Sequence, residues 1–375
     1  MSLNPTGLYL HIPFCSVKCR FCDFAAFPGR RNDIPLYLQA LHKDIHVITE
    51  KVPRVVLNTL YVGGGTPSLL EPKDWSSLLA VVRDRFEVLP DWEATLECNP
   101  DGVNHEKLRA WKDSGMNRLS FGLQTDEPPL LASLGRTHSY DDYVRVLSAA
   151  RARGFRNINV DLMYGLPGQS VEGWIKTLRG VLETNPDHLS AYGLQVEEST
   201  YYHRSGVQSD DDLQADMYEA AVDLLDSAGY VHYEISNFAR PGFECRHNLR
   251  YWRNQECLGA GVSSAWYDGV RRHTNTHDLT TYIESVLTGG RPQFDTVSLS
   301  PDEREGENVM LGLRLQEGVV PSPRGLTLYG KGLDRCVQEG LLVREGDRYR
   351  PTCRGWQLSN RIFVGLLGPS IESEV

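Results

Sequence analysis

The sequence lacks several features that would each indicate a particular class of protein. Its 39 lysine and arginine residues are outnumbered by 49 aspartate and glutamate residues, and the formal net charge of -10 gives no basic surface for nucleic acid. No uninterrupted apolar run approaches membrane-spanning length, and the N-terminal segment has neither the basic start nor the apolar core of a signal peptide. We therefore expect a cytoplasmic protein that does not bind nucleic acid.

The cysteines are too few for a disulfide-rich protein, and they are unevenly distributed. Of the 8 cysteines, Cys15, Cys19 and Cys22 lie within eight consecutive positions, which favours metal binding in a reducing compartment over a disulfide framework. An iron-sulfur cubane is normally held by four thiolates, so a set of three leaves one iron open to an exogenous ligand. The spacing leaves a structural zinc site open as the alternative, with a fourth donor such as His11.

Six apolar runs, each followed by a segment with helical spacing or helix-start signals, predict repeated βα units around a parallel sheet. We expect strands at residues 8–12, 59–62, 94–97, 118–123, 158–163 and 188–194. We expect helices at residues 34–50, 72–85, 104–114, 140–153, 171–183 and 211–228. Right-handed crossovers then produce either an open doubly wound sheet or a partial barrel.

Motifs whose residues could bind a ligand follow the predicted strands, at the C-terminal strand ends where such folds place their active sites. The Gly63-Gly64-Gly65-Thr66-Pro67 run lets backbone groups approach a ligand, although a tight turn would also explain it. The carboxylates of Glu97 and Asp161 suit ribose hydroxyls or a cationic amino group, and their alternative roles are helix capping or a place in a solvated loop. Gln124 and Arg136 add donors, and an arginine can grip a carboxylate with two parallel hydrogen bonds.

The Cys-x3-Cys-x2-Cys motif, preceded by Tyr-Leu-His-Ile-Pro-Phe, resembles the signature of the radical S-adenosylmethionine (SAM) superfamily in its coproporphyrinogen-oxidase-like branch. The resemblance implies a partial (β/α)6 barrel of the TIM type, in which Cys15, Cys19 and Cys22 hold a [4Fe-4S] cluster whose open iron chelates SAM. The cofactors supply the radical chemistry, and an electron donor serves the cluster. Matching positions imply that SAM is contacted by Tyr9, Gly64, Gly65, Thr66, Glu97, Gln124, Arg136 and Asp161.

A second motif follows a strand expected at residues 230–235. Here the segment from Cys245 to Trp252 combines a histidine, aromatic rings and a thiol, which suits a haem pocket, but a packed hairpin with a hydrogen-bonded histidine also explains it. Its His-Asn-x-x-Tyr pattern resembles that of HemW-type haem chaperones. This resemblance implies that haem is bound through His247, Asn248 and Tyr251.

Two departures distinguish the chain from oxygen-independent coproporphyrinogen III oxidases, the alternative family in this branch. Phe24 occupies the position of their fourth cysteine, and fourteen residues precede Cys15 where they carry a long N-terminal segment. The haem-chaperone resemblance implies haem itself, acceptor haemoproteins such as membrane-bound respiratory enzymes, and a homodimer. An oxidase would instead decarboxylate a porphyrinogen propionate, and the sequence assigns no catalytic residue to that reaction.

We expect three domains, at residues 1–229, 230–290 and 291–375. The first is the barrel, the second an extension with the haem motif, and Gly289-Gly290 with Pro292 marks the start of the third. Helices expected at residues 302–315 and 333–339, followed by two short strands about Gly346-Asp347, predict a small winged-helix-like α+β domain.

Overall fold

A single twelve-stranded sheet dominates the computed structural model, which describes residues 5–50, 55–290 and 293–367. The order across it is β14-β13-β12-β11-β1-β4-β5-β6-β7-β8-β10-β9. Six of its strands run parallel in chain order, as the sequence predicts: β1 (Thr6–Ile12), β4 (Val56–Gly64), β5 (Glu87–Cys98), β6 (Arg118–Gln124), β7 (Asn157–Tyr164) and β8 (His188–Gly193).

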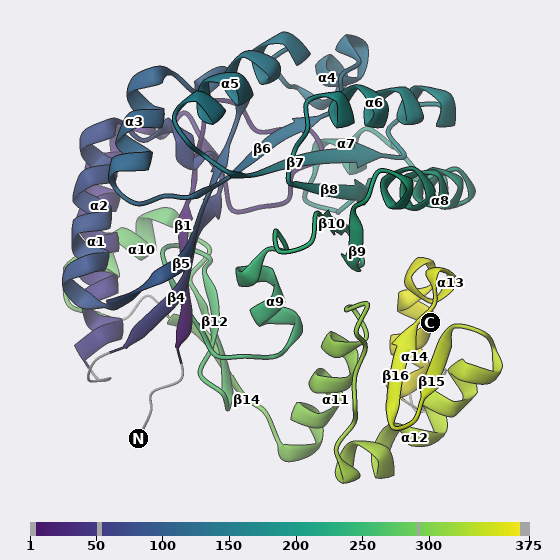
Figure 1. Ribbon diagram of the computed structural model, residues 1–375. Coiled ribbons are helices and arrows are strands. Elements are labelled where there is room, and N and C mark those ends of the chain that lie inside the picture. The colour runs from purple at the N-terminus through teal and green to yellow at the C-terminus, as the bar shows by residue number, and fades with distance from the viewer. Residues whose placement is uncertain (1–4, 51–54, 291–292, 368–375) are drawn as a thin grey trace.

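Helices cover the convex face of these six strands, and the sheet curves into a partial barrel (Figure 1). They are α1 (Ile34–Glu50), α2 (Pro72–Arg85), α3 (His105–Asp113), α5 (Tyr140–Ala152), α6 (Val171–Glu183) and α8 (Asp211–Ser227). Local caps start several of them; Ser139 and Asp142 form a capping box on α5, for example. The predicted βα units and the partial barrel are therefore confirmed.

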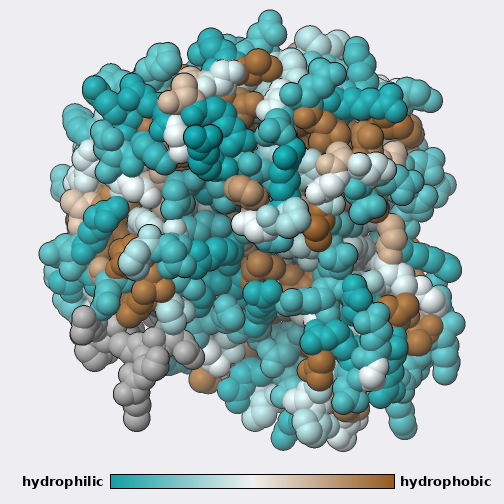
Figure 2. Space-filling model, in the orientation of Figure 1, coloured by the Kyte–Doolittle hydropathy of each residue, from teal (hydrophilic) through white to brown (hydrophobic). Residues whose placement is uncertain are grey.

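The two faces of the barrel strands have opposite chemistry, because alternate residues of a strand point to opposite sides. Leu8, Leu10 and Ile12 of β1 are fully buried in the core beneath the helices. Each such side chain contributes about 1.5–3 kcal/mol to folding. Tyr9 and His11 alternate with them and face the barrel interior, where the Tyr9 hydroxyl contacts the His11 ring. The outer surface seen in Figure 2 is mostly hydrophilic, with small hydrophobic patches. The interior of the barrel is therefore the polar part of the buried structure.

Antiparallel strands extend the sheet at both edges. Beside β1 lie β11 (Cys257–Ala260), which is parallel to it, and then β12 (Ala265–Tyr267), β13 (Arg271–Asn275) and β14 (Gln293–Ser298). The other edge ends in β10 (Asn237–Ala239) and β9 (Val231–Glu234). Because β14 pairs with β13, the chain leaves the large sheet only after Ser298, eight residues beyond the boundary expected at 290–291. The division into domains stays a prediction.

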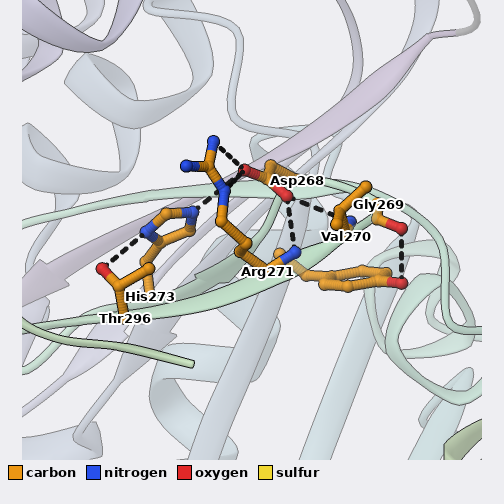
Figure 3. A network of polar contacts seen from close by, with 7 residues as sticks. Asp268, Gly269, Val270, Arg271, His273 and Thr296 are labelled. Atoms are coloured by element: carbon orange, nitrogen blue, oxygen red, sulfur yellow. Dashed lines mark hydrogen bonds and ion pairs between the residues drawn. The ribbon is translucent and has the colours of Figure 1, made fainter. Parts of the chain in front are cut away.

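A polar network fixes the turn between β12 and β13 (Figure 3). The Asp268 carboxylate accepts hydrogen bonds from the backbone N-H groups of Val270 and Arg271 at 3.0 and 2.7 Å. It also lies 3.0 Å from Nε2 of His273, whose Nδ1 lies 3.2 Å from Thr296 Oγ1 on β14. One carboxylate thus ties the turn to the edge of the sheet.

The remaining elements form a smaller α+β unit with its own hydrophobic cluster at the lower right of Figure 1. They are α11 (Pro301–Gly312), α12 (Pro323–Gln338), the hairpin of β15 (Leu342–Glu345) and β16 (Arg348–Pro351), α13 (Cys353–Gln357) and α14 (Ser359–Leu367). The hairpin agrees with the prediction, but α12 begins ten residues before the predicted 333–339. The first part of α12 was not predicted because its three glycines have low helix propensity, although Ser322 caps its start. The winged-helix comparison stays a prediction.

The described helices include none that is both long and apolar enough to cross a membrane. Four short elements lie in the connections between the larger ones: β2 (Phe14–Cys15), α4 (Pro128–Leu134), α7 (Tyr201–Arg204) and α9 (Arg246–Trp252).

Candidate functional site

The cysteine loop follows β1 at the C-terminal mouth of the barrel and is held by backbone hydrogen bonds. The N-H of Arg20 donates to Leu134 O at 3.0 Å, at the end of α4, and the Arg20 carbonyl accepts from Tyr202 N in α7 at 3.1 Å. Phe27 N donates to Pro13 O at 2.7 Å and closes the loop. The predicted ligands are therefore displayed on an ordered segment.

Cys15 is packed closely against the turn that follows β4. A Cβ at Gly65 would lie 3.0 Å from Cys15 Sγ and 2.8 Å from the Phe14 carbonyl, so only glycine lets the β4 turn pass so close. Thr66 Oγ1 donates to Cys15 Sγ at 3.4 Å. Burial and the neighbouring thiols raise the pKa of Cys22 to about 11. Iron binding would displace that proton.

The zinc alternative depends on a fourth donor, and His11 is already engaged. Its Nδ1 lies 3.0 Å from the Tyr9 hydroxyl and its Nε2 lies 2.9 Å from Ala25 O. In the described part of the chain no three His, Cys, Asp or Glu side chains converge enough to hold one metal ion. A cubane does not require such convergence, because each thiolate binds a different iron. The arrangement therefore suits a cluster better than a single zinc ion.

Gly64 and Glu97 lie together at the ends of β4 and β5. The Gly64 N-H donates to Glu97 Oε2 at 3.1 Å, and the Tyr61 hydroxyl donates to Oε1 at 2.8 Å. Gly64 has φ +115, and a Cβ there would lie 2.6 Å from the His11 ring, so the position requires glycine. Burial raises the pKa of Glu97 to about 7. In its ionised form this carboxylate can also accept hydrogen bonds from a ligand at the ends of β4 and β5.

Arg136 lies across the mouth from Cys19, in a hollow of about 200 Å³ that also reaches Thr66. Its Nη1 donates to Asn99 Oδ1 at 2.7 Å, while its buried Nε has no hydrogen-bond partner among the described residues. An unpaired buried guanidinium nitrogen suits an anionic ligand group such as a carboxylate. Asn99 was missed as a site residue, although it follows Glu97 and Cys98 at the same strand end.

The other predicted SAM contacts lie further apart. Tyr9 stacks on Tyr61 inside the barrel, with ring centroids 6.2 Å apart. Asp161 on β7 accepts hydrogen bonds from Ser120 Oγ at 3.0 Å and Asn159 Nδ2 at 2.8 Å, and burial raises its pKa. Gln124 ends β6 in the left-handed region at φ 70. All eight predicted SAM residues therefore line the mouth or the upper interior, around the cysteine loop.

The predicted haem motif is at the opposite end of the barrel. Arg250 of α9 donates to Pro5 O and to Asn58 Oδ1, both at 3.0 Å, which places α9 where β1 and β4 begin. In Figure 1, α9 lies below the barrel, between it and α11. The structure therefore separates the haem motif from the cysteine loop.

His247 is buried, with 1% of its surface exposed, and both ring nitrogens have partners. Nδ1 lies 2.9 Å from Thr59 Oγ1, and Nε2 lies 3.0 Å from the Tyr251 hydroxyl. Cys257 Sγ lies 3.8 Å from each of His247 Nε2 and the Tyr251 hydroxyl. Burial lowers the pKa of His247 to about 3, so the imidazole is neutral. Asn248 is only partly buried on the same helix. A neutral imidazole, a phenol and a thiol thus meet at one point.

Comparison with known proteins gives a consistent picture. The family model described as "Radical SAM superfamily" matches residues 9–180. "Heme chaperone HemW" of Escherichia coli K12 is 39% identical over 97% of this chain and 98% of its own, and that of Mycobacterium tuberculosis H37Rv is 36% identical over 97% and 95%. The solved coproporphyrinogen III oxidase HemN of Escherichia coli superposes with a TM-score of 0.86 at 25% identity, over 96% of this chain and 90% of that one. The chain therefore belongs to the HemW family of the radical SAM superfamily, and this membership implies a [4Fe-4S] cluster and SAM.

Proposed function

We propose that this protein binds haem and transfers it to acceptor haemoproteins. The observation that carries the proposal is the match at 34–39% identity, over nearly the whole chain, to proteins named heme chaperones. The meeting of His247, Tyr251 and Cys257 at one end of the barrel supports it, because imidazole, phenolate and thiolate are all known axial ligands of haem iron.

A hollow lies beside the C-terminal end of α9, where a haem propionate could reach it. This hollow of about 770 Å³ lies between the starts of the barrel strands and α11, within the range of small-molecule sites. Arg250, Arg304 and Arg324 line it together with Glu256 and Glu305, and the side chains of the haem motif lie outside its lining. Arg250 already donates to Pro5 O and Asn58, and Arg324 pairs with Asp302, which leaves Arg304 to attract a propionate. Because both nitrogens of His247 are engaged, iron ligation by this imidazole requires its contact with Thr59 or its contact with Tyr251 to break.

At the other end of the barrel, Cys15, Cys19 and Cys22 would hold the cluster, while Gly64, Glu97 and Arg136 would orient SAM beside it. When bound, these two cofactors supply one-electron reductive chemistry. The protein's own part is to seat Cys15 against Gly65, to accept ligand hydrogen bonds at Glu97, and to offer the free Nε of Arg136. We infer that this mouth controls assembly or gating of the haem carrier.

A radical decarboxylase acting on coproporphyrinogen III is the second candidate, and the similarity to HemN favours it. Phe24, which stands in place of the fourth cysteine of those oxidases, has 62% of its surface exposed and offers no thiolate. The test is an anaerobic assay of the reconstituted protein with SAM and reductant, with coproporphyrinogen III in one arm and haem in the other. Retained haem with no decarboxylated porphyrin supports the carrier; protoporphyrinogen formation would establish the oxidase.

The setting of this function is also part of the proposal. We place the protein in the cytoplasm, as a homodimer served by an electron donor, with membrane-bound respiratory enzymes among its acceptors. Transfer would be measured by incubating the haem-loaded protein with an apo-haemoprotein and following the Soret band of each after separation. Haem that stays on the protein with every acceptor tested would contradict a carrier role.

A further inference from the structure

A row of buried side chains crosses the barrel interior from the predicted SAM site to α9. Asn159 Nδ2 lies 2.8 Å from Asp161 Oδ1, and Asn159 Oδ1 lies 2.6 Å from His188 Nδ1. His188 Nε2 lies 2.8 Å from the Tyr233 hydroxyl, which accepts a hydrogen bond from Cys245 N at 3.2 Å. Cys245 is the N-cap residue of α9. The four hydrogen bonds thus connect the two ends of the barrel without a gap.

The chemistry of the row fixes the direction of every hydrogen bond. Asn159 donates from Nδ2 to the Asp161 carboxylate and to Ser120 Oγ at 2.6 Å, so its Oδ1 can only accept. Nδ1 of His188 must therefore carry the proton. Burial lowers the pKa of His188 well below its ordinary value, so the ring is neutral and Nε2 accepts from the Tyr233 hydroxyl. All four donors point toward Asp161.

Hydrogen bonds that run in one direction polarise each other, most strongly where water is excluded. His188 has no exposed surface, Asn159 has 2%, Tyr233 has 7% and Cys245 has none. A weaker hydrogen bond between Asn159 and Asp161 therefore weakens the following hydrogen bonds of the row, including the one that the Cys245 N-H donates to Tyr233. The same end of α9 is held by Glu93, which accepts from the N-H groups of Arg246 and His247, both at 3.1 Å.

We propose that this hydrogen-bonded row couples the two ligand sites, so that SAM at Asp161 and haem at α9 each raise the affinity of the protein for the other. The inference rests on the proposed function, since it takes haem as the ligand of α9. Asn159, His188 and Tyr233 are positioning residues in it, because each would act through its hydrogen bonds to neighbours in the row.

The sign of the coupling follows from the direction of the row. A ribose hydroxyl that donates to Asp161 competes with Asn159 for the carboxylate and weakens the hydrogen bonds behind it. The start of α9 is then held less firmly, which helps His247 on α9 to leave Thr59 on β4 and to present Nδ1 to haem iron. Linkage requires that haem strengthen SAM binding by the same factor. We expect a factor of about five or more, the lower end of common allosteric couplings.

The experiment is a pair of reciprocal titrations on the anaerobically reconstituted full-length protein. The Kd for haem is measured from the Soret band without and with saturating SAM, and the Kd for SAM is measured by equilibrium dialysis without and with haem. Two equal factors of about five or more support the inference. A factor of one in the wild-type protein overturns it, while haem that binds under neither condition overturns the proposed function as well.

The variant Tyr233→Phe tests the route, because it keeps the ring and removes the hydroxyl shared by His188 and Cys245. The coupling factor should fall to about one, and haem affinity without SAM should rise toward the SAM-saturated wild-type value. Tyr143→Phe is the matched control, because it removes a buried hydroxyl that lies 2.7 Å from Thr184 Oγ1, outside the row. Coupling that persists in Tyr233→Phe, or that Tyr143→Phe removes equally, overturns the route.

Discussion

The Nε2 atom of His247 lies 3.0 Å from the hydroxyl of Tyr251, one helical turn further along α9. The pair occupies the first and last positions of the His-Asn-x-x-Tyr pattern, so the spacing of four residues puts both side chains on one helix face. Thr59 occupies the other imidazole nitrogen. Both imidazole nitrogens are thus engaged, so the proposed ligation of haem iron by His247 requires one of these two contacts to break.

Replacing His247 by alanine should weaken haem binding by about tenfold or more, because it removes the imidazole that would bind the iron. The cluster should assemble normally, since α9 and the cysteine loop are at opposite ends of the barrel. A haem titration and an assay of iron and acid-labile sulfide measure the two effects. His105→Ala, which removes an exposed histidine on α3, is the control. An unchanged haem affinity in His247→Ala would move the site elsewhere.

Replacing Cys19 by serine should abolish cluster assembly, because two remaining thiolates cannot hold a cubane that already has one open iron. The reconstituted variant should contain almost no acid-labile sulfide, and its fold should be retained because the side chain is partly exposed. Cys353→Ser removes an exposed cysteine of the C-terminal unit and should leave cluster content unchanged. A full cluster in Cys19→Ser would show that the three cysteines were misassigned.

Local sequence signals predicted much of the barrel. The helices at 34–50, 72–85 and 171–183 begin and end as expected, because apolar residues recur with helical period in each segment, and Glu71 and Ser170 precede the second and third as N-caps. No such signal reports the pairing of β11 with β1, whose partners Cys257 and Gly7 are 250 residues apart. The extension was therefore expected as a separate segment, although it is part of the large sheet.

The sequence identified more of the residues of the site than of the contacts between them. Gly64 and Glu97 were both identified, and they meet because neighbouring parallel strands end at the same edge. The position of α9 at the far end of the barrel depends on contacts such as Arg250 with Asn58, which only the folded chain creates. The interior row was missed as well. Asn159 and Asp161 alternate with buried apolar residues on β7, and this period of two was the available signal.

Replacing Gly65 by alanine should lower cluster occupancy several-fold, although the added group is only one methyl. Its Cβ would lie 2.8 Å from the Phe14 carbonyl, which is backbone and cannot swing away, and 3.0 Å from Cys15 Sγ. Cys15 would be displaced from its place in the ligand set. Iron content after reconstitution measures the effect. Gly330→Ala in α12, where the nearest atom is 4.0 Å from the new Cβ, should leave iron content unchanged and stabilise the helix by about 0.5–1 kcal/mol.

Replacing Asp268 by alanine should lower the free energy of unfolding by about 1 kcal/mol, because the β12–β13 turn loses the acceptor of several hydrogen bonds. Burial alone would raise the pKa of this carboxyl, but the hydrogen bonds from His273 and from the backbone of Arg271 and Val270 lower it to about 2. Folding thus depresses the pKa from 3.8, so the stabilisation is complete above about pH 4 and disappears as the pH falls toward 2. Urea unfolding at pH 7 and pH 3 should show a smaller difference between wild type and variant at the lower pH. The control Asp347→Ala removes an exposed carboxylate in the turn between β15 and β16 and should change the free energy of unfolding by less than about 0.5 kcal/mol at pH 7. An equal loss at both pH values in Asp268→Ala would contradict the role of the ionised carboxylate.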